Sequence, residues 1–274
     1  MYKAISLGCI GHAAPFHEAA PILHRHGAEG VWLSLTPDVM AMPERTRSIL
    51  QDNGLRFAGF NAAVPWSAAE HEDFGLLRAQ AQYAERMGVT RAVTGIMPFS
   101  DTMDFAENYA FHLKRYRESV KVLASFGIRL GVEFIGVPSI RNGHKYAFLK
   151  NMDEMLAFLA DVDPDNTGLL LDLFHFETAG HRNEELLKLR DEQIVLVHIM
   201  DAPNVPMEEQ QDLVRALPGS TGVLHIGGFF DALTKIGYSG PVLPEPFDKS
   251  LAEMPLEDAI RTAMDAVDRV WPKK

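Results

Sequence analysis

Short apolar runs alternate with longer amphipathic stretches along the whole chain. Eight runs are rich in aliphatic and β-branched residues: 4–11, 30–35, 55–63, 91–96, 129–135, 168–175, 194–201 and 241–247. The stretches between them repeat apolar residues at steps of three and four, most clearly in 152–162, 227–237 and 255–271, a spacing typical of helices that cover a core with one face. A strand followed by a helix, repeated eight times, predicts an α/β fold, the (β/α)8 or TIM barrel.

The connections between these elements differ in length at the two ends of the predicted strands. Those that lead from a helix into the next strand are short and contain a glycine, as in DNGLRF and RMGVTR. Those that leave a strand are long: 61–73, 95–104, 136–151 and 201–228. Loops that follow the strands build the active site of a barrel, so we expect the site at the C-terminal face.

Length, composition and charge agree with this architecture. A chain of 274 residues with 47% hydrophobic content can form one large core, and we expect a single domain over 1–274. The net charge of -11 argues against a nucleic-acid partner, and no run approaches the roughly 18 apolar residues of a membrane span. The single cysteine, Cys9, excludes an intrachain disulfide, and the first residues lack a secretion signal, so we expect a cytoplasmic protein without a membrane partner.

Four residues with metal-ligand side chains stand at the ends of the last four predicted strands: Glu133, Asp172, His198 and Glu245. Side chains alternate along a strand, and in RLGVEF this places Glu133 toward the barrel axis when its apolar neighbours face the helices. Three buried carboxylates need a cation near them, because an unpaired buried charge is costly. Three carboxylates and one imidazole suit Mn²⁺, our first choice, Mg²⁺ or Co²⁺, and Zn²⁺ also binds such sets.

The motifs around these residues, GVEF, LDLFH, VHIMDAP and PEPF, resemble those of xylose-isomerase-like sugar isomerases and epimerases. Most of the C-terminal half, including VRALPG and GYSGPVLPEPF, is similar to the 2-keto-myo-inositol isomerases, whereas the N-terminal half matches only in strand and helix rhythm. The resemblance implies one divalent metal on the four residues, substrate contacts from His175 and Arg215, and a homodimer or homotetramer. The chain departs from the pattern at PGSTGV, which is one residue longer, and at Pro244.

The predicted chemistry is proton transfer next to a ketone. A divalent ion that chelates the ketone oxygen and a neighbouring hydroxyl acidifies the C–H between them and stabilises the resulting enediolate. Glu133 and Glu245 are expected to move the proton, giving epimerisation if they act on opposite faces and isomerisation if one acts alone. Trp66 could stack on a sugar ring or pack on the rim of the site. We therefore predict a metal-dependent isomerase or epimerase of a ketose or keto-cyclitol.

Two other functions fit the same residues. A dehydratase or lyase acting on a keto-cyclitol, 3-dehydroshikimate or a 3-keto-glycoside could use the same enolate to expel a leaving group. A non-catalytic sugar-binding accessory subunit could retain the barrel without the activity. Among the other polar residues, Asp201 either supports the metal ligands or caps the following turn, and His112 and His181 are interpreted as surface residues.

Overall fold

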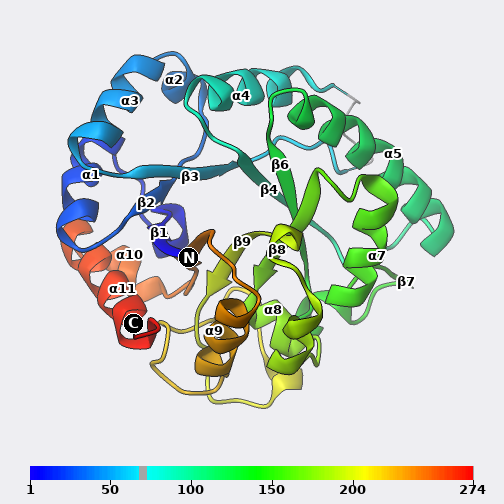
Figure 1. The fold of residues 1–274 in the computed structure, drawn as a ribbon. Helices are drawn as coiled ribbons and strands as arrows, with labels where there is room; N and C mark the ends of the chain where they lie inside the picture. Colours follow the sequence, from blue (N-terminus) through cyan, green and yellow to red (C-terminus); the bar gives the residue numbers. More distant parts are fainter. Residues whose placement is uncertain (68–72, 274) are drawn as a thin grey trace.

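Eight parallel strands form a closed barrel in the computed structural model, which describes residues 1–67 and 73–273 (Figure 1). The strands are β1 (Tyr2–Ile5), β2 (Gly30–Trp32), β3 (Arg56–Asn61), β4 (Arg91–Ile96), β6 (Arg129–Phe134), β8 (Thr167–Asp172), β9 (Ile194–Ile199) and β10 (Pro241–Pro244). They pair in chain order, and β1 closes the ring against β10. The barrel that the alternating pattern predicted is confirmed.

Helices surround the barrel as an outer layer (Figure 1). The longer helices are α1 (Phe16–Arg25), α3 (Pro43–Asp52), α4 (Gly75–Arg86), α5 (Phe105–Ala124), α7 (Met152–Val162), α9 (Ile226–Lys235) and α11 (Leu256–Val270). Short helices and 3-10 turns lie in the connections: α2 (Pro37–Met40), α6 (Pro138–Arg141), α8 (Leu173–Thr178), α10 (Lys249–Glu253), η1 (Gly8–Ile10), η2 (Asn183–Lys188), η3 (Asp191–Gln193) and η4 (Met207–Glu209). In the loops, β5 (Phe99–Ser100) and β7 (Tyr146–Ala147) form a small antiparallel sheet. None of the described helices is long and apolar enough to cross a membrane.

The strand predicted over 168–175 was wrong at its C-terminal boundary. The strand stops at Asp172, and α8 begins at the next residue. Asp172 Oδ1 accepts a hydrogen bond from the backbone nitrogen of His175 at 2.9 Å, so the carboxylate acts as the N-cap that starts the helix. An apolar run cannot by itself distinguish a buried strand from a buried helix, and the cap decided the boundary.

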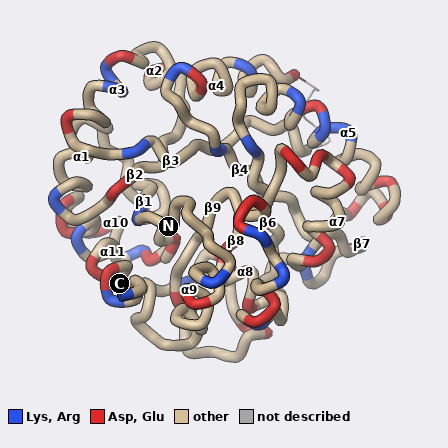
Figure 2. The backbone as a smooth tube through the Cα atoms, in the orientation of Figure 1, with Lys and Arg blue, Asp and Glu red and all other residues tan. Residues whose placement is uncertain are grey.

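The apolar residues separate into an inner and an outer core. A small cluster fills the barrel: Tyr2, Ala4, Trp32, Ala58, Val93, Leu170, Val195, Leu196 and Leu243. Leu130, Val132 and Phe134 belong to the large cluster between strands and helices. Glu133 lies between these outward-facing residues on β6 and therefore turns toward the barrel axis, as the alternation predicted. In Figure 2, Lys and Arg are interspersed with Asp and Glu along the outer elements.

Candidate active site

Glu133, Asp172, His198 and Glu245 meet at the C-terminal end of the barrel. Each contributes one metal-ligand atom, and the four atoms lie within 4.8 Å of one another. Strand pairing produces this arrangement, because Asp172 on β8 lies in register with His198 on β9. The backbone nitrogen of Glu245 donates to the carbonyl of Ile199 at 3.0 Å, which continues the pairing of β10 with β9 past Pro244.

The guanidinium of Arg215 lies against two of the four residues. Its Nη1 is 2.8 Å from Asp172 Oδ2 and 2.9 Å from Glu245 Oε2. Burial raises the pKa of the Asp172 carboxyl, but Arg215 and the nearby histidines outweigh burial and hold this pKa well below its usual range. For Glu245, burial is likewise outweighed by His198 and Arg215, and its pKa is lowered. Asp172 and Glu245 are therefore the two carboxylates that carry charge without a metal.

Glu133 and His198 both tend to hold a proton, in contrast to Asp172 and Glu245. Burial raises the pKa of Glu133 well above its usual range, and the carboxylates of Asp172 and Glu245 add to the effect. Burial lowers the pKa of His198, but Glu245 and Asp172 outweigh it and raise this pKa to about 10. Without a metal, two carboxylates thus face two cations, Arg215 and protonated His198.

The donor set fits a divalent ion. Glu133 Oε1 is buried without a hydrogen-bond partner among the described residues, and His198 Nδ1 lies 3.3 Å from Glu245 Oε2. Buried polar atoms without partners are costly, so such atoms commonly indicate an ion or water. Three carboxylates and one imidazole are ligands that Mn²⁺, Mg²⁺, Co²⁺ and Zn²⁺ accept. All four residues could therefore bind one ion after His198 and Glu133 lose their protons.

His175 is brought to the site by the start of α8. A Cβ at Gly136 would lie 2.1 Å from the carbonyl oxygen of His175, so only glycine lets the end of the β6 segment approach α8 this closely. His175 Nε2 lies 3.1 Å from Arg215 Nη2. Burial lowers the pKa of His175 to about 4, and the imidazole is neutral at pH 7.

Asp212 and two aromatic rings hold Arg215, and the sequence analysis did not single them out. The Asp212 carbonyl accepts from Arg215 Nε at 2.9 Å, and Asp212 Oδ1 accepts from Nη2 at 3.0 Å. The Arg215 Cζ atom lies 4.7 Å from the ring centroid of Phe174 and 4.8 Å from that of Phe247, within cation–π range. Phe247, with φ 42°, is the only non-glycine residue with a positive φ in the described part of the chain, a backbone strain typical of functional sites. Their positions in the sequence were a usable signal, because Phe174 lies within LDLFH, Phe247 within PEPF, and Asp212 two residues before VRALPG.

Asp201 organises the loop that follows Arg215. Its carboxylate accepts hydrogen bonds from four successive backbone nitrogens, Thr221 to Leu224, at distances of 2.7 to 3.1 Å. Its backbone exchanges two 2.8 Å hydrogen bonds with Ala216, the residue after Arg215. These contacts agree with the expected role of Asp201 in capping a turn. The turn lies about twenty residues further along the chain and is not the one that directly follows Asp201.

Trp66 lies in the loop after β3 with 43% of its surface exposed. Arg115 Nη1 donates to the carbonyls of Pro65 and Ser67 at 2.8 and 2.9 Å, so the backbone is anchored on both sides of the indole.

Cys9 Sγ lies 3.5 Å from Glu245 Oε1, and burial raises the pKa of this thiol well above its usual range. Cys9 is therefore a protonated neighbour of the site, in agreement with a structural role.

The interpretation of His112 and His181 as surface residues was wrong. His112 is buried on α5, where its ring stacks on Phe148 at 5.5 Å. His181 is half-buried, and its Nε2 accepts a hydrogen bond from the backbone of Met152 at 3.1 Å. Helical periodicity showed that His112 lies in a helix but did not show which face carries it.

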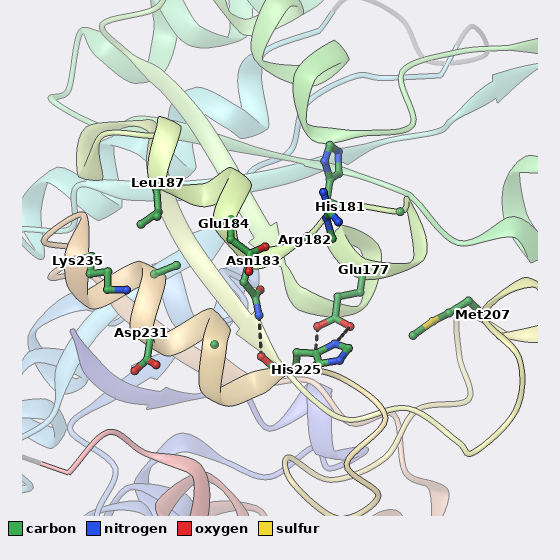
Figure 3. Close-up of a pocket in the computed structure, with 13 residues that line it drawn as sticks. Glu177, His181, Arg182, Asn183, Glu184, Leu187, Met207, His225, Asp231 and Lys235 are labelled. Carbon is green, nitrogen blue, oxygen red and sulfur yellow. Dashed lines mark hydrogen bonds and ion pairs between the residues drawn. The ribbon is translucent and has the colours of Figure 1, made fainter.

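A cavity of about 650 Å³ opens elsewhere, on the outer surface between η2 and α9 (Figure 3). Glu177 and His225 meet at its edge, with 2.9 Å between Oε2 and Nδ1, and tie α8 to the start of α9. Asn183, Asp231 and Lys235 also line it. None of the four metal-ligand candidates does, so this cavity is separate from the barrel mouth.

Comparison with known proteins agrees with the fold. The family model described as xylose isomerase-like TIM barrel matches residues 11–270. Among curated proteins, an inosose isomerase of Halalkalibacterium halodurans is 29% identical over 156 residues, which is 57% of this chain and 52% of the relative. The match therefore spans about half the length of that relative.

Solved structures resemble the barrel along almost its whole length. A xylose isomerase domain protein of Alicyclobacillus acidocaldarius superposes with a TM-score of 0.86 at 22% identity, covering 98% of both chains. A protein named IolI, with a bound zinc atom, superposes with a TM-score of 0.82 at 20% identity, again over 98% of both chains. At these identities the likeness concerns the fold. With the family model matching nearly the whole sequence, the chain belongs to the xylose isomerase-like TIM barrel family.

Proposed function

We propose that this protein is a divalent-metal-dependent isomerase or epimerase of a ketose or keto-cyclitol. The observation that carries the proposal is the convergence of Glu133, Asp172, His198 and Glu245 at the barrel mouth. An arginine and a neutral histidine, two groups suited to binding substrate oxygens, lie beside them. The relative named inosose isomerase favours a keto-cyclitol, a ring with one ketone and hydroxyl groups on its other carbons.

The four residues would hold one ion. When bound, a divalent ion polarises the ketone and the adjacent hydroxyl and so lowers the barrier to forming the enediolate. The zinc atom in the IolI structure supports a divalent ion on this fold, and the ligand set also suits Mn²⁺, our first choice. Asp172 also has a structural role, because its Oδ1 atom accepts the hydrogen bond that caps α8.

Glu133 and Glu245 would move the proton. Glu245 is restrained, since Arg215 contacts Oε2 at 2.9 Å and Cys9 contacts Oε1 at 3.5 Å. Glu133 keeps Oε1 without a hydrogen-bond partner among the described residues. Glu133 is therefore our first candidate for the base that removes the proton, with Glu245 returning it on the opposite face in an epimerisation.

His175 and Arg215 would orient the substrate. Neutral His175 can exchange a hydrogen bond with a hydroxyl, and Arg215 can donate to a carbonyl or hydroxyl oxygen. Asp212, Phe174 and Phe247 restrict the guanidinium to one orientation. Trp66 could stack on the face of the ring from the loop after β3, where the backbone on both sides of it is held.

Solvent-deuterium exchange tests the proposal directly. The Mn²⁺-loaded protein is incubated in D₂O with a panel of ketoses and keto-inositols, and deuterium at the carbon next to the ketone is measured by mass spectrometry. We expect exchange with at least one compound, its loss in EDTA, and a decrease of several orders of magnitude in the Glu133→Gln and Glu245→Gln variants. Glu154→Gln, the same change at the start of α7, should keep full activity.

The alternatives give different results in the same assay. A product lighter by one water would identify a dehydratase. Absence of exchange with every compound would refute the proton-transfer proposal. Retention of all activity by both glutamine variants would instead favour a sugar-binding accessory subunit.

A further inference from the structure

Asn61, the last residue of β3, lies across the barrel mouth from the four metal-ligand candidates. In the closed ring, β3 is four strands from β9 in either direction, so its end is opposite the end that carries His198. Asn61 is exposed although its strand belongs to the barrel wall. An exposed polar residue at the C-terminal end of a barrel strand is where substrate contacts are found in this fold.

Side-chain alternation turns Asn61 inward. Phe60 belongs to the outer core, so the residue after it faces the barrel axis. Trp32, which donates a hydrogen bond to the Asn61 side chain, belongs to the inner core and agrees with this direction. Its height follows from the strand register. Glu133 aligns with Gly95, and Val93, two residues earlier on β4, aligns with Asn61.

The stagger of the barrel brings Asn61 to the level of Glu133. Neighbouring strands of an eight-stranded barrel with a shear of 8 are offset by about one residue each. On the other side of β6, the register partner of Glu133 is Leu170, two residues before Asp172. Asp172 is therefore displaced by two positions from the register partner of Glu133 on β8. A displacement in the same sense, about one residue for each of the two steps from β6 through β4 to β3, places Asn61 level with the metal-ligand candidates.

Trp32 fixes the orientation of the Asn61 carboxamide. The indole Nε1 donates to Asn61 Oδ1 at 3.0 Å, and an indole N–H can only donate. Gly59 makes room for the indole, since a Cβ there would lie 2.3 Å from a ring atom of Trp32, and its φ of 157° suits glycine. The Nδ2 group therefore faces away from Trp32, and no described residue accepts a hydrogen bond from it.

We propose that Asn61 determines substrate specificity by donating a hydrogen bond from Nδ2 to a substrate oxygen remote from the reacting carbons. The proposal rests on the function proposed above. A cyclitol carries oxygen on each ring carbon, so a ring held by the metal-ligand residues on one side presents an acceptor on the other. Asn61 would favour such a polyhydroxylated ring over a compound with an apolar far side.

Two variants separate the donor from the rest of the side chain. Asn61→Asp keeps an acceptor for Trp32 but replaces the N–H donor by an oxygen, and Asn61→Leu removes both polar atoms at similar size. The measured quantities are kcat/KM for deuterium exchange with 2-keto-myo-inositol, the same value for its monodeoxy analogues, and the Kd for Mn²⁺. Asn53→Asp, the same change at the C-terminal end of α3, is the matched control.

We expect both variants to lose about tenfold in kcat/KM with 2-keto-myo-inositol, the size of one lost hydrogen bond, while the Kd for Mn²⁺ of the uncharged Asn61→Leu variant changes little. One monodeoxy analogue, the one that lacks the oxygen at Asn61, should react equally with wild type and Asn61→Leu, which a merely structural role would not produce. Equal losses with all analogues, or no loss, would refute the role of Asn61 while leaving the proposed function intact. Absence of exchange by the wild type would overturn both.

Discussion

Replacement of Arg215 by Met should destabilise the metal-free protein far more than the metal-loaded protein. The Arg215 and Asp172 side chains are 1% and 0% exposed, and Nη1 contacts two carboxylates at 2.8 and 2.9 Å. Removal of one partner from a buried ion pair costs about 3 to 5 kcal/mol, because the remaining charge is left without compensation. At about 2 to 4 °C per kcal/mol, the melting temperature in EDTA should fall by about 6 to 20 °C.

A divalent ion should restore most of this loss. It supplies positive charge to the same carboxylates, and binding to the folded state alone stabilises it in proportion to the logarithm of ligand concentration over Kd. The Kd for Mn²⁺ should also decrease in Arg215→Met, because a neighbouring cation has been removed. Mn²⁺ should therefore raise the melting temperature of the variant more than that of the wild type.

Calorimetric melts in EDTA and in saturating Mn²⁺, with a Mn²⁺ titration of both proteins, measure these quantities. Arg117→Met is the control, since exposed Arg117 donates to the carbonyl of Asp161 on the outer layer. It should change stability by about 0.5 kcal/mol at most, with or without metal. An equal loss for Arg215→Met in EDTA and in Mn²⁺ would show that Arg215 contributes packing only. No loss in EDTA would refute its role as the cation that balances the site.

Three further predictions concern other groups. Asp212→Asn should lower kcat/KM by about ten- to a hundredfold with little change in the Kd for Mn²⁺, because it releases Arg215 from its position; an unchanged kcat/KM would contradict this. Mn²⁺ binding at pH 7 should release up to about two protons, from Glu133 and His198, measured by calorimetry in buffers of different ionisation enthalpy; a value near zero would contradict the raised pKa values. Burial lowers the pKa of His112 to about 4, below the usual histidine value of 6.5. The unfolded chain therefore binds the extra proton between these values, and stability should fall with decreasing pH in that window by about 3 kcal/mol at most. Urea unfolding of His112→Gln should show a weaker pH dependence there.

The predicted barrel follows from local patterns, and for that reason it could be obtained from the sequence. Apolar runs with β-branched residues, three- and four-residue helical spacing, and glycines at helix ends each depend on neighbours along the chain. The long loops after strands indicated the functional face, and the parity of RLGVEF indicated that Glu133 points inward. Boundaries were less certain, as Leu173 shows, because the strand and helix on either side of Asp172 are equally apolar.

The sequence by itself thus determined the fold, the face that carries the candidate site and the four residues that meet there, since the C-terminal ends of the strands in a closed parallel barrel lie on the same rim. Only the tertiary structure decided what surrounds them. Arg215 lies against Asp172 and Glu245, Asp212 holds Arg215, and Asn61 ends β3, which lies opposite β9 in the ring. These contacts depend on register, stagger and loop path, which sum many small interactions between segments far apart in the chain. Periodicity records only the local environment of each segment, and it carries no measure of distance across the barrel.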